Sequence, residues 1–501
     1  MKQIDQNNIP IYIIDTIKTL KNKGFEAYIV GGCVRDLILK REPKDWDITT
    51  NATPEEIQSC FIKTVYENNF GTVAVVIENT EENKKYFSSD EDKNIIIEIT
   101  PYRTEGVYSD GRHPDTVAFG NNLEEDLQRR DFTINAMAYD PINDILKDIY
   151  GGLNDIEKRV IKTVGEAKDR FSEDSLRVFR AIRFAVQLDF TVSHETIEGI
   201  MSTKEGLERV SKERIRDEFI KIVESPNPAF ALGFMHKIDI LKHISPEIEE
   251  GVGCKQGGAH KYDVFEHLIQ ALQHAADKNW PLDIRLSALF HDIGKPRTKR
   301  VPGKNIKPTF YGHEVVGAKM AKKILEDLKF SRETIDKVVK MVRYHMFFSD
   351  TEQISLSAVR RIVANVGPEN IWDLMKVREC DRVGMAKAEA PYRLRKYHAM
   401  IEEVMRDPIS VKQLKINGDY MIKELHVKPG RRMGWMLHAL LEEVLDDPTK
   451  NDIEYLVNRV KDMENLTDTD LRTLGEAGKS KKDELEEAEV TELHKKHNVK
   501  K

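Results

Sequence analysis

The sequence predicts an α+β protein with a mixed α/β head, a helical neck, a second helical domain and a helical tail. Short runs rich in Val and Ile are separated by turn residues and confined to the first 150 residues, as in "EAYIVGG", "GTVAVVIENT" and "NIIIEITPYR". A fourth run, "NDILKDIYGG", is a weaker strand signal. After Gly151 and Gly152, apolar residues recur at spacings of three and four, as in "EDSLRVFRAIRFAVQL", which is typical of amphipathic helices.

The length of 501 residues suits several domains of about 150 residues each. Changes of pattern and Pro/Gly clusters set the expected boundaries. They are 1–150 for the head, 151–228 for the neck, 229–400 for the second helical domain, 401–465 for the tail, and 466–501 for a polar C-terminal run that is expected to be flexible.

The composition, with 40% hydrophobic and 33% charged residues, is that of a globular protein without membrane spans. The first thirty residues hold no long apolar run, so we expect no secretory signal and a cytoplasmic location. The net charge of -7 gives no global signal for nucleic acid. Four scattered cysteines indicate neither disulfides nor a thiolate zinc site, so any metal must use His and carboxylates.

The segment "YIVGGCVRDLILKREPKDWDITT" is predicted to pass from a strand, through a turn at Gly31 and Gly32, into a helix and then a second strand. Adjacent glycines let phosphate oxygens approach a helix N-terminus, and Arg35 can add charged hydrogen bonds. Asp45 and Asp47 are two residues apart on the expected strand, so both carboxylates face one side and can share Mg²⁺. Two solvated aspartates at a strand edge are the alternative.

These motifs, "GGCVRD" and "KDWDITT", resemble the head of the class II tRNA nucleotidyltransferase and poly(A) polymerase family, within the polymerase-β-like nucleotidyltransferases. "RRDFTINAMAYD", "EDSLRVFRAIRF" and "ERIRDEF" follow in the family's order. The resemblance covers residues 20–225. It implies a polymerase-β-like head that uses two Mg²⁺ ions, held by Asp45 and Asp47, with ATP and CTP as substrates.

The "RRDFTINA" segment suits a ribose and phosphate site. Asp131 and Asn135 can bond sugar hydroxyls while Arg130 contacts phosphate, and the resemblance implies the same roles. A helix cap at Asp131 is the structural alternative.

The charged residues of "EDSLRVFRAIRF" are expected to form one stripe on a helix. Asp174 offers acceptors and Arg177 a fork of donors, so together they can pair with the edge of cytosine or adenine. The resemblance implies that they select the base, with Glu173 in support, and Arg180 is expected at the triphosphate. A stripe of solvated ion pairs is the alternative. Three residues of "ERIRDEF" are expected to brace this helix: Glu213, Arg214 and Glu218.

Glu98 is expected to be the third metal-binding carboxylate, because it alternates inward with Ile96 and Thr100 on a neighbouring strand. The polar segment that follows is expected to be a mobile loop beside the site. Family members that add only two cytidines are distinguished by a shortened loop, which this chain keeps. Addition of all three nucleotides is therefore favoured, with three loop candidates: Arg103, Asp110 and Arg112.

Histidines and aspartates recur in a fixed order in the second helical domain. They are His267, His291, Asp292, His313, His345 and Asp381. A lone His is more often structural, but neutral imidazoles with carboxylates suit a divalent transition metal such as Mn²⁺, Ni²⁺ or Fe²⁺. The order resembles the HD phosphohydrolase superfamily, including its binuclear members, and implies a phosphatase or phosphodiesterase site. A basic loop expected to bind phosphate or RNA follows: Lys295, Arg297, Lys299, Arg300, Lys304 and Lys307.

The stretch "LKINGDYMIKELHVKPGRRMGWMLHALLEEVL" resembles the family's tail region, which holds the tRNA elbow. Arg431 and Arg432 follow a Pro-Gly turn, where a helix start can meet backbone phosphate. A domain that serves only packing is the alternative.

The expected function is the addition or repair of the 3′-terminal CCA of tRNA from CTP and ATP, with tRNA bound at its acceptor end and elbow. The alternatives within the family are a poly(A) polymerase and an enzyme that adds only A or only CC. Two further alternatives are an HD phosphohydrolase with a nucleotide-sensing head and a non-catalytic tRNA chaperone. The sequence predicts no oligomeric state.

Overall fold

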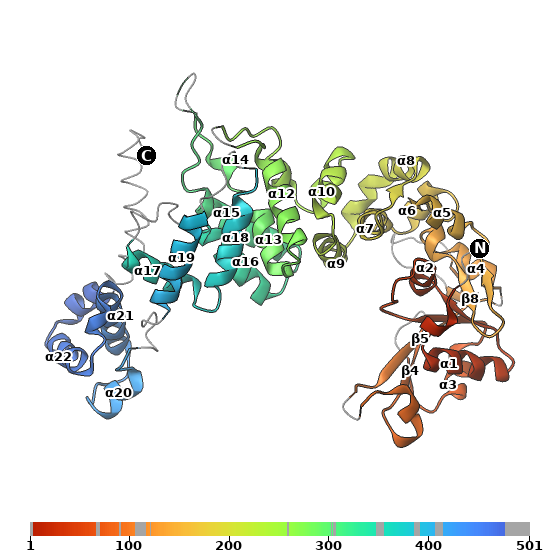
Figure 1. Ribbon diagram of the computed structural model, residues 1–501, viewed down its shortest axis with the longest axis horizontal. Coiled ribbons are helices and arrows are strands. Elements are labelled where there is room, and N and C mark those ends of the chain that lie inside the picture. Colours follow the sequence, from red (N-terminus) through yellow and green to blue (C-terminus); the bar gives the residue numbers. More distant parts are fainter. Residues whose placement is uncertain are drawn as a thin grey trace. The chain divides into compact units, whose positions relative to one another are not determined.

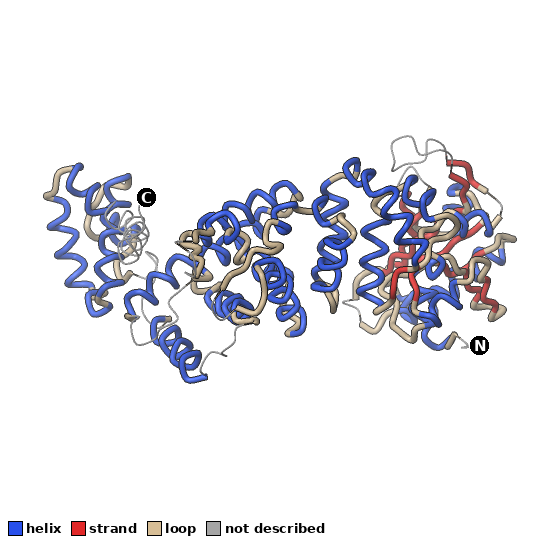
Figure 2. The backbone as a smooth tube through the Cα atoms, turned by 90° about the horizontal axis from the view of Figure 1, so that it is seen from above, coloured by secondary structure: helices blue, strands red, loops and turns tan. Residues whose placement is uncertain are grey.

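The computed structural model describes residues 4–66, 71–89, 92–105, 117–120, 122–257, 260–301, 303, 307–346, 355–384, 391–405 and 414–475. The chain forms two compact units, Met1–Ile244 and Ser245–Lys501. In the described residues every named strand lies in the first unit, and the second is built of helices (Figure 2). This confirms the α+β class. No helix within those ranges is long and apolar enough to span a bilayer.

The first unit is centred on a seven-stranded sheet of order β3-β4-β5-β2-β1-β8-β9, part of which is labelled in Figure 1. Its strands are β1 (Ala27–Val30), β2 (Asp47–Thr50), β3 (Thr64–Tyr66), β4 (Val73–Ile77), β5 (Ile95–Pro101), β8 (Ala138–Asp140) and β9 (Ile145–Lys147). Strands β2 and β5 are parallel, and the other neighbours are antiparallel. Two small sheets pair β6 (Arg103–Glu105) with β7 (Val117–Phe119) and β10 (Val160–Ile161) with β11 (Thr191–Val192).

The two faces of β5 differ in burial. Ile97 and Ile99 are fully buried, whereas Ile96 and Glu98 are exposed. The alternation that groups Glu98 with Ile96 and Thr100 is therefore correct, but the expectation that this face points inward is wrong. Ile97 and Ile99 face the core instead, because burying isoleucine side chains requires no desolvation of a charge, whereas burying Glu98 would. Glu98 thus lies on the open face of the sheet.

Helices pack around the sheet and continue into the neck (Figure 1). They are α1 (Ile11–Asn22), α2 (Gly32–Ile38), α3 (Pro54–Cys60), α4 (Leu123–Gln128), α5 (Gly152–Lys158), α6 (Ala167–Glu173), α7 (Arg177–Leu188), α8 (His194–Thr203), α9 (Lys212–Val223) and α10 (Pro228–Lys237). Helix α7 packs on α9, and α10 packs on both through the buried side chains of Leu232 and Met235. The neck therefore continues to Ile244, beyond the boundary expected at 228.

The second unit begins with a helical bundle. Its helices are α11 (Pro246–Glu249), α12 (Val264–Asp277), α13 (Leu282–Phe290), α14 (Lys295–Thr298), α15 (His313–Asp327), α16 (Arg332–Tyr344), α17 (Leu356–Val366), α18 (Ile371–Asp381) and α19 (Pro391–Val404). Helix α12 starts where Asp263 and Glu266 form a capping box. Helix α13 contacts α12, α15, α16 and α18, so it is the central helix of the bundle.

The tail is a small helical cluster of α20 (Gly418–Lys423), α21 (Arg431–Asp446) and α22 (Ile453–Glu464). Its buried core includes Leu440, Leu456 and Leu471. Because Leu471 is fully buried, the packed tail extends past the boundary expected at 465. The run expected to be flexible is 466–501; its first part, 466–475, belongs to the packed tail, and residues 476–501 lie outside the described part.

Candidate active site and metal centre

Gly31 joins β1 to α2 and lies close to two charged side chains. Its φ of 85° is in the left-handed region, which residues with a Cβ rarely adopt. A Cβ here would lie 3.1 Å from Nη1 of Arg130 and 3.5 Å from Oδ2 of Asp47. Gly32 is the first residue of α2. The predicted residues Gly31, Asp47 and Arg130 therefore converge at the start of α2.

Asp47 is the first residue of β2, and its Cα partner on β5 is Glu98. Partners on adjacent strands project to the same face, so these two carboxylates are neighbours on the open face of the sheet. Asp45 differs from the expectation, since it lies in an exposed bend before β2. The pairing of β2 with β5 begins only at Asp47, so one strand does not present both aspartates.

The charge of Asp47 is disfavoured in the protein. Burial raises the pKa of this carboxyl, Arg130 lowers it and Asp45 raises it again, with a net increase. A divalent cation would relieve this, and carboxylate oxygens are the ligands that Mg²⁺ prefers. The donor set therefore fits Mg²⁺, although tight clusters of three or more ligand residues occur, within the described ranges, only in the second unit.

Four predicted nucleotide-binding residues form a chain of hydrogen bonds. Arg35 Nη1 donates to Asn135 Oδ1 at 2.7 Å, and Asn135 Nδ2 donates to Asp131 Oδ1 at 3.2 Å. Arg180 Nε donates to the other oxygen of Asp131 at 2.8 Å. Burial alone raises the pKa of Asp131, but Arg180 outweighs it and the pKa falls to about 2. The Asp131 carboxylate is thus ionised and holds the Arg180 side chain in place.

The base-selecting candidates Asp174 and Arg177 do not share one helix. Asp174 is extended, with φ -142° and ψ 101°, and it separates α6 from α7. The predicted continuous stripe is therefore wrong at this point. Arg214 donates to both oxygens of Asp174, at 3.2 and 2.7 Å. Arg177 donates to Glu173 at 2.6 Å and to the carbonyl of Arg129 at 3.1 Å, so both candidates are held in place by neighbours.

The predicted bracing residue Glu218 and the three loop candidates are further predicted residues of the first unit. Glu218 accepts from Arg183 Nε at 2.6 Å, so α9 braces α7 through an ion pair as well as through apolar packing. Arg103 begins β6. Asp110 and Arg112 lie outside the described residues.

The six predicted ligands of the second unit converge. They are His267 on α12, His291 and Asp292 directly after α13, His313 at the start of α15, His345 directly after α16 and Asp381 at the end of α18. Their donor atoms form two groups within 4.8 Å, one of His267, His291, Asp292 and Asp381 and one of Asp292, His313 and His345. Asp292 belongs to both groups, with Oδ2 3.2 Å from His291 Nε2 and Oδ1 3.1 Å from His313 Nε2.

Backbone contacts orient these imidazoles. Nδ1 of His291, His313 and His345 lies 2.7 or 2.8 Å from the carbonyl three residues earlier, which leaves Nε2 facing the cluster. Both carboxylate oxygens of Asp292 are buried. Lys295 Nζ lies 2.5 Å from Oδ2 as an ion pair, and imidazole Nε2 atoms face both oxygens at 3.1 to 3.5 Å. A buried carboxylate surrounded by imidazole nitrogens fits a metal ion.

The metal-ligand cluster of the second unit is buried and contains both carboxylates and imidazoles, which shift one another's pKa values. Burial lowers the pKa of His291, but Asp292 and Asp381 outweigh it and raise this pKa to about 10. Burial raises the pKa of Asp292, yet Lys295 and His291 bring it well below its ordinary range. In His345 burial dominates and lowers the pKa. Carboxylates that stay ionised here are available as metal ligands.

The predicted basic loop is partly internal. Lys295 is buried and donates to Gln256 Oε1 at 2.7 Å. Arg297 donates to both oxygens of Glu250, at 2.8 and 2.6 Å. Both residues of the expected phosphate- or RNA-binding loop thus already have an amide or carboxylate partner. Lys304 lies outside the described part.

In the tail, Arg431 is the exposed first residue of α21. Arg432 pairs with Asp468 and donates to the carbonyl of Leu466 at 3.1 Å. Arg432 therefore ties α21 to the end of the described chain, whereas Arg431 faces solvent.

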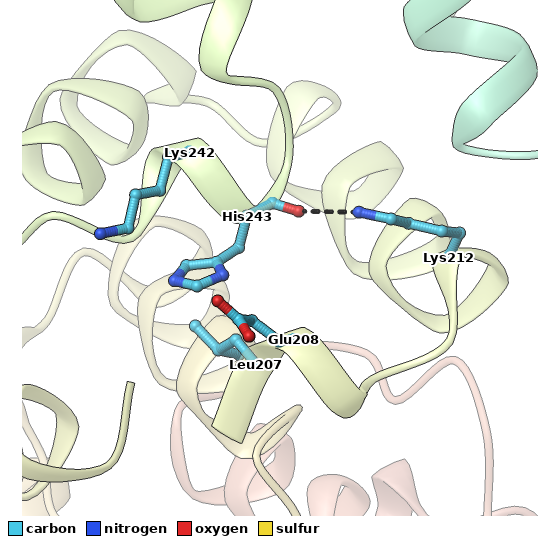
Figure 3. Close-up of a pocket in the computed structure, with 5 residues that line it drawn as sticks. All are labelled: Leu207, Glu208, Lys212, Lys242 and His243. Carbon is cyan, nitrogen blue, oxygen red and sulfur yellow. Dashed lines mark hydrogen bonds between the residues drawn. The ribbon is translucent and has the colours of Figure 1, made fainter. Parts of the chain in front are cut away.

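A separate pocket of about 390 Å³ lies at the end of the neck, in the first unit (Figure 3). It is lined by Leu207, Glu208, Lys212, Lys242 and His243. Lys212 donates to the carbonyl of His243 at 3.3 Å, and Lys242 pairs with Asp239 at 2.8 Å. Its lining includes none of the predicted nucleotide-binding residues.

The sequence interpretation missed Asp126. This carboxylate is fully buried on α4 and bonds both Arg129 and Arg130. Its spacing of three and four residues before those arginines in "EDLQRR" is the signal that could have found it.

Comparison with known protein families matches three parts of the chain. A family model described as "Poly A polymerase head domain" matches residues 27–162, and "Probable RNA and SrmB-binding site of polymerase A" matches residues 189–251. The model "HD domain" matches residues 264–383, which hold all six predicted ligands of the second unit.

Similar proteins cover nearly the whole chain. The CCA-adding enzyme of Ligilactobacillus salivarius is 31% identical over 453 residues, which are 89% of this chain and 94% of that enzyme. The CCA-adding enzyme of Lactobacillus delbrueckii subsp. bulgaricus is 46% identical over 207 residues, 41% of this chain and 48% of that protein, so this match spans about half the length of that relative. The crystal structure of the Bacillus stearothermophilus CCA-adding enzyme in complex with CTP matches with a TM-score of 0.64 and 25% identity, over 90% of this chain and 98% of that one. The chain thus belongs to the CCA-adding enzyme family.

Proposed function

We propose that this chain is a tRNA nucleotidyltransferase that adds or repairs the 3′-terminal CCA of tRNA from CTP and ATP. The observation that carries the proposal is the convergence of Gly31, Asp47 and Arg130 at the start of α2, with Glu98 paired to Asp47 on the open face of the sheet. The proposed substrates are cytoplasmic, and we propose the same location for the protein.

The reaction joins the 3′-hydroxyl oxygen of tRNA to the α-phosphorus of the nucleotide and releases pyrophosphate. Asp45, Asp47 and Glu98 would hold two Mg²⁺ ions, which lower the pKa of the attacking hydroxyl and neutralise the leaving pyrophosphate when bound. Arg130 lies beside Gly31, where it can bind the triphosphate. Asp174 and Arg177 would recognise the base edge, and their partners fix both side chains before the nucleotide binds.

The test incubates the full chain with Mg²⁺ and tRNA transcripts that end before CCA, after C and after CC, with labelled CTP and ATP supplied singly and together. Stepwise growth to CCA followed by a stop is the expected result. Asp47→Ala should lower the rate at least about a hundredfold, because a lost metal ligand removes several kcal/mol of transition-state stabilisation. Glu81→Ala, at a side chain that is 91% exposed, should leave the rate unchanged. Unlimited A addition would instead identify a poly(A) polymerase, and growth that stops at CC or needs a preformed CC end would identify a partial enzyme.

For the second unit we propose a metal-dependent phosphohydrolase. The shared Asp292, whose buried oxygens lie between two sets of imidazoles, favours this second activity. His291→Ala should lower the content of bound transition metal, measured by elemental analysis after loading with Mn²⁺, Ni²⁺ or Fe²⁺ and desalting. His274→Ala is the matched control, since His274 lies on α12 but pairs with Glu379 outside the cluster. Equal metal content in both variants and the unaltered chain would contradict the assignment.

A further inference from the structure

Asp126 is a buried carboxylate at which several elements of the first unit meet. It lies on α4 with no exposed surface. Arg129 donates to it at 3.0 Å through Nε and at 2.6 Å through Nη2, and Arg130 Nη2 donates at 3.4 Å. The Thr49 hydroxyl on β2 lies 3.2 Å from Asp126 Oδ2 and shares its one proton between this carboxylate and the Thr100 carbonyl at 3.1 Å. Burial raises the pKa of Asp126, but the two arginines outweigh it and keep this pKa below its usual value, so the carboxylate is charged.

The partners of Asp126 lead to the phosphate side of the site. Thr49 is two residues after Asp47 on β2, and so on the same face of the strand. Arg130, held through Nη2, brings Nη1 next to Gly31 and lowers the pKa of Asp47. Its Nε is buried and has no hydrogen-bond partner among the described residues. The atom of Arg130 that reaches the start of α2 is Nη1.

A second path leads to the base-selecting side. The Arg129 side chain is fixed by Asp126, and the Arg129 carbonyl accepts from Arg177 Nη2 at 3.1 Å. Arg177 is therefore positioned by the backbone of Arg129, and the side chain of Arg129 is held by Asp126.

We propose that Asp126 is a positioning residue that sets both the triphosphate-binding Arg130 and, through Arg129, the base-selecting Arg177. This inference rests on the proposed nucleotidyl transfer. Asp126 touches no reacting atom. Its negative charge holds the Arg130 guanidinium beside α4. Without that charge Arg130 is free to pair with Asp47, whose charge it already senses, and such pairing would oppose cation binding. Loss of the charge would therefore weaken nucleotide binding and relax base choice together.

The test measures kcat and KM for CTP and ATP, and the incorporation of UTP, with Asp126→Asn in the full chain. Asn keeps the shape but removes the charge, and KM for both nucleotides should rise about tenfold or more, since hydrogen bonds to charged groups are the stronger ones. UTP incorporation should rise as well, with a smaller change in kcat. The matched control is Asp140→Asn, which removes the charge of another buried carboxylate of the same unit, one whose hydrogen-bond partners are Lys21, Ile142 and Asn143.

Asp140→Asn should lower stability to a similar degree with unchanged KM and UTP incorporation. If the two variants alter KM equally, or neither does, Asp126 has only a structural role and the proposal is overturned. Should Asp126→Asn fail to fold, Thr49→Val removes a single donor to Asp126, and KM should rise about threefold. An unchanged KM in Thr49→Val would then overturn it.

Equilibrium binding of CTP separates this proposal from the proposed function. If the unaltered chain adds no nucleotide but binds CTP, nucleotidyl transfer fails, and weaker CTP binding by Asp126→Asn than by Asp140→Asn still supports the positioning role. If the unaltered chain does not bind CTP, both proposals are overturned.

Discussion

Asp131 is a residue whose charge is maintained by its partners inside the protein. Arg180 holds its pKa near 2, against an ordinary value of 3.8, despite complete burial. The folded pKa lies below the unfolded one, so the ion pair stabilises the first unit above about pH 4 and this contribution is lost as the pH falls towards 2. A shift of this size corresponds to about 2 kcal/mol of unfolding free energy at neutral pH.

Asp131→Asn should therefore destabilise the first unit by about 2 kcal/mol at pH 7, and the difference from the unaltered chain should shrink between pH 4 and 2. Hydrogen exchange of the amides in β1, β2 and β5, read by mass spectrometry, reports this unit alone. A difference that stays constant over this pH range would show that the ionised form of Asp131 is not what stabilises the fold.

At single residues, local sequence motifs predicted residues that the structure brings together, but not the residues that support them. Gly31, Asn135 and Asp131 were predicted from short motifs, and the structure brings them together with Arg35 and Arg130. The position of Asp45 outside β2 depends on where pairing with β5 begins. The contact of Asp126 with Thr49 joins residues 77 positions apart in the sequence, so no local pattern could predict it.

At the level of elements, hydrophobic periodicity predicted strands and helices well where one face is buried. The runs that became β1, β4 and β5 are rich in Val and Ile, and the helix signal of α7 corresponds to a buried stripe that includes Val178 and Ile182. Periodicity failed between α6 and α7, because apolar spacing continues across the break at Asp174. At the break, Arg214 of α9 binds the Asp174 carboxylate from another element, a contact that no local pattern contains.

The turn between β1 and α2 gives an element-level prediction. Gly31→Ala should cost about 1–2 kcal/mol of stability from the left-handed backbone alone. The new Cβ would also lie 3.1 Å from Arg130 Nη1, so this guanidinium must shift and KM for CTP and ATP should rise several-fold.

Gly165→Ala is the matched control for Gly31→Ala. Gly165 also has a positive φ, of 70°, but a Cβ added there would meet no atom within 4 Å, so this substitution has a backbone cost without the close approach. Thermal unfolding and steady-state kinetics of both variants separate the two effects. An equal KM for the two variants would mean that the space at Gly31 does not set the position of Arg130.

At the scale of the whole molecule, the two candidate sites lie in different compact units. The nucleotide-binding candidates fall within Met1–Ile244, and the six histidine and aspartate ligands fall within Ser245–Lys501. The sequence predicted both sites but misplaced the boundary between the units, because the Pro-rich break near residue 228 precedes α10, which packs on the neck. A Pro-rich break in the sequence marks the end of a helix. The boundary of a compact unit depends instead on which neighbouring helices the next helix packs against.

This division predicts two activities that can be lost separately. The double variant with His291→Ala and Asp292→Ala removes one ligand of the first metal group and the carboxylate shared by both. It should abolish transition-metal binding in the second unit and hydrolysis of phosphomonoester and phosphodiester substrates, while CCA addition stays within about twofold of the unaltered chain, because substitutions at independent sites act separately. Asp47→Ala should have the opposite pattern, with addition lost and the transition-metal content and hydrolysis of the second unit unchanged. Loss of both activities in either variant, with the other unit still protected in hydrogen exchange, would mean that the two sites act as one.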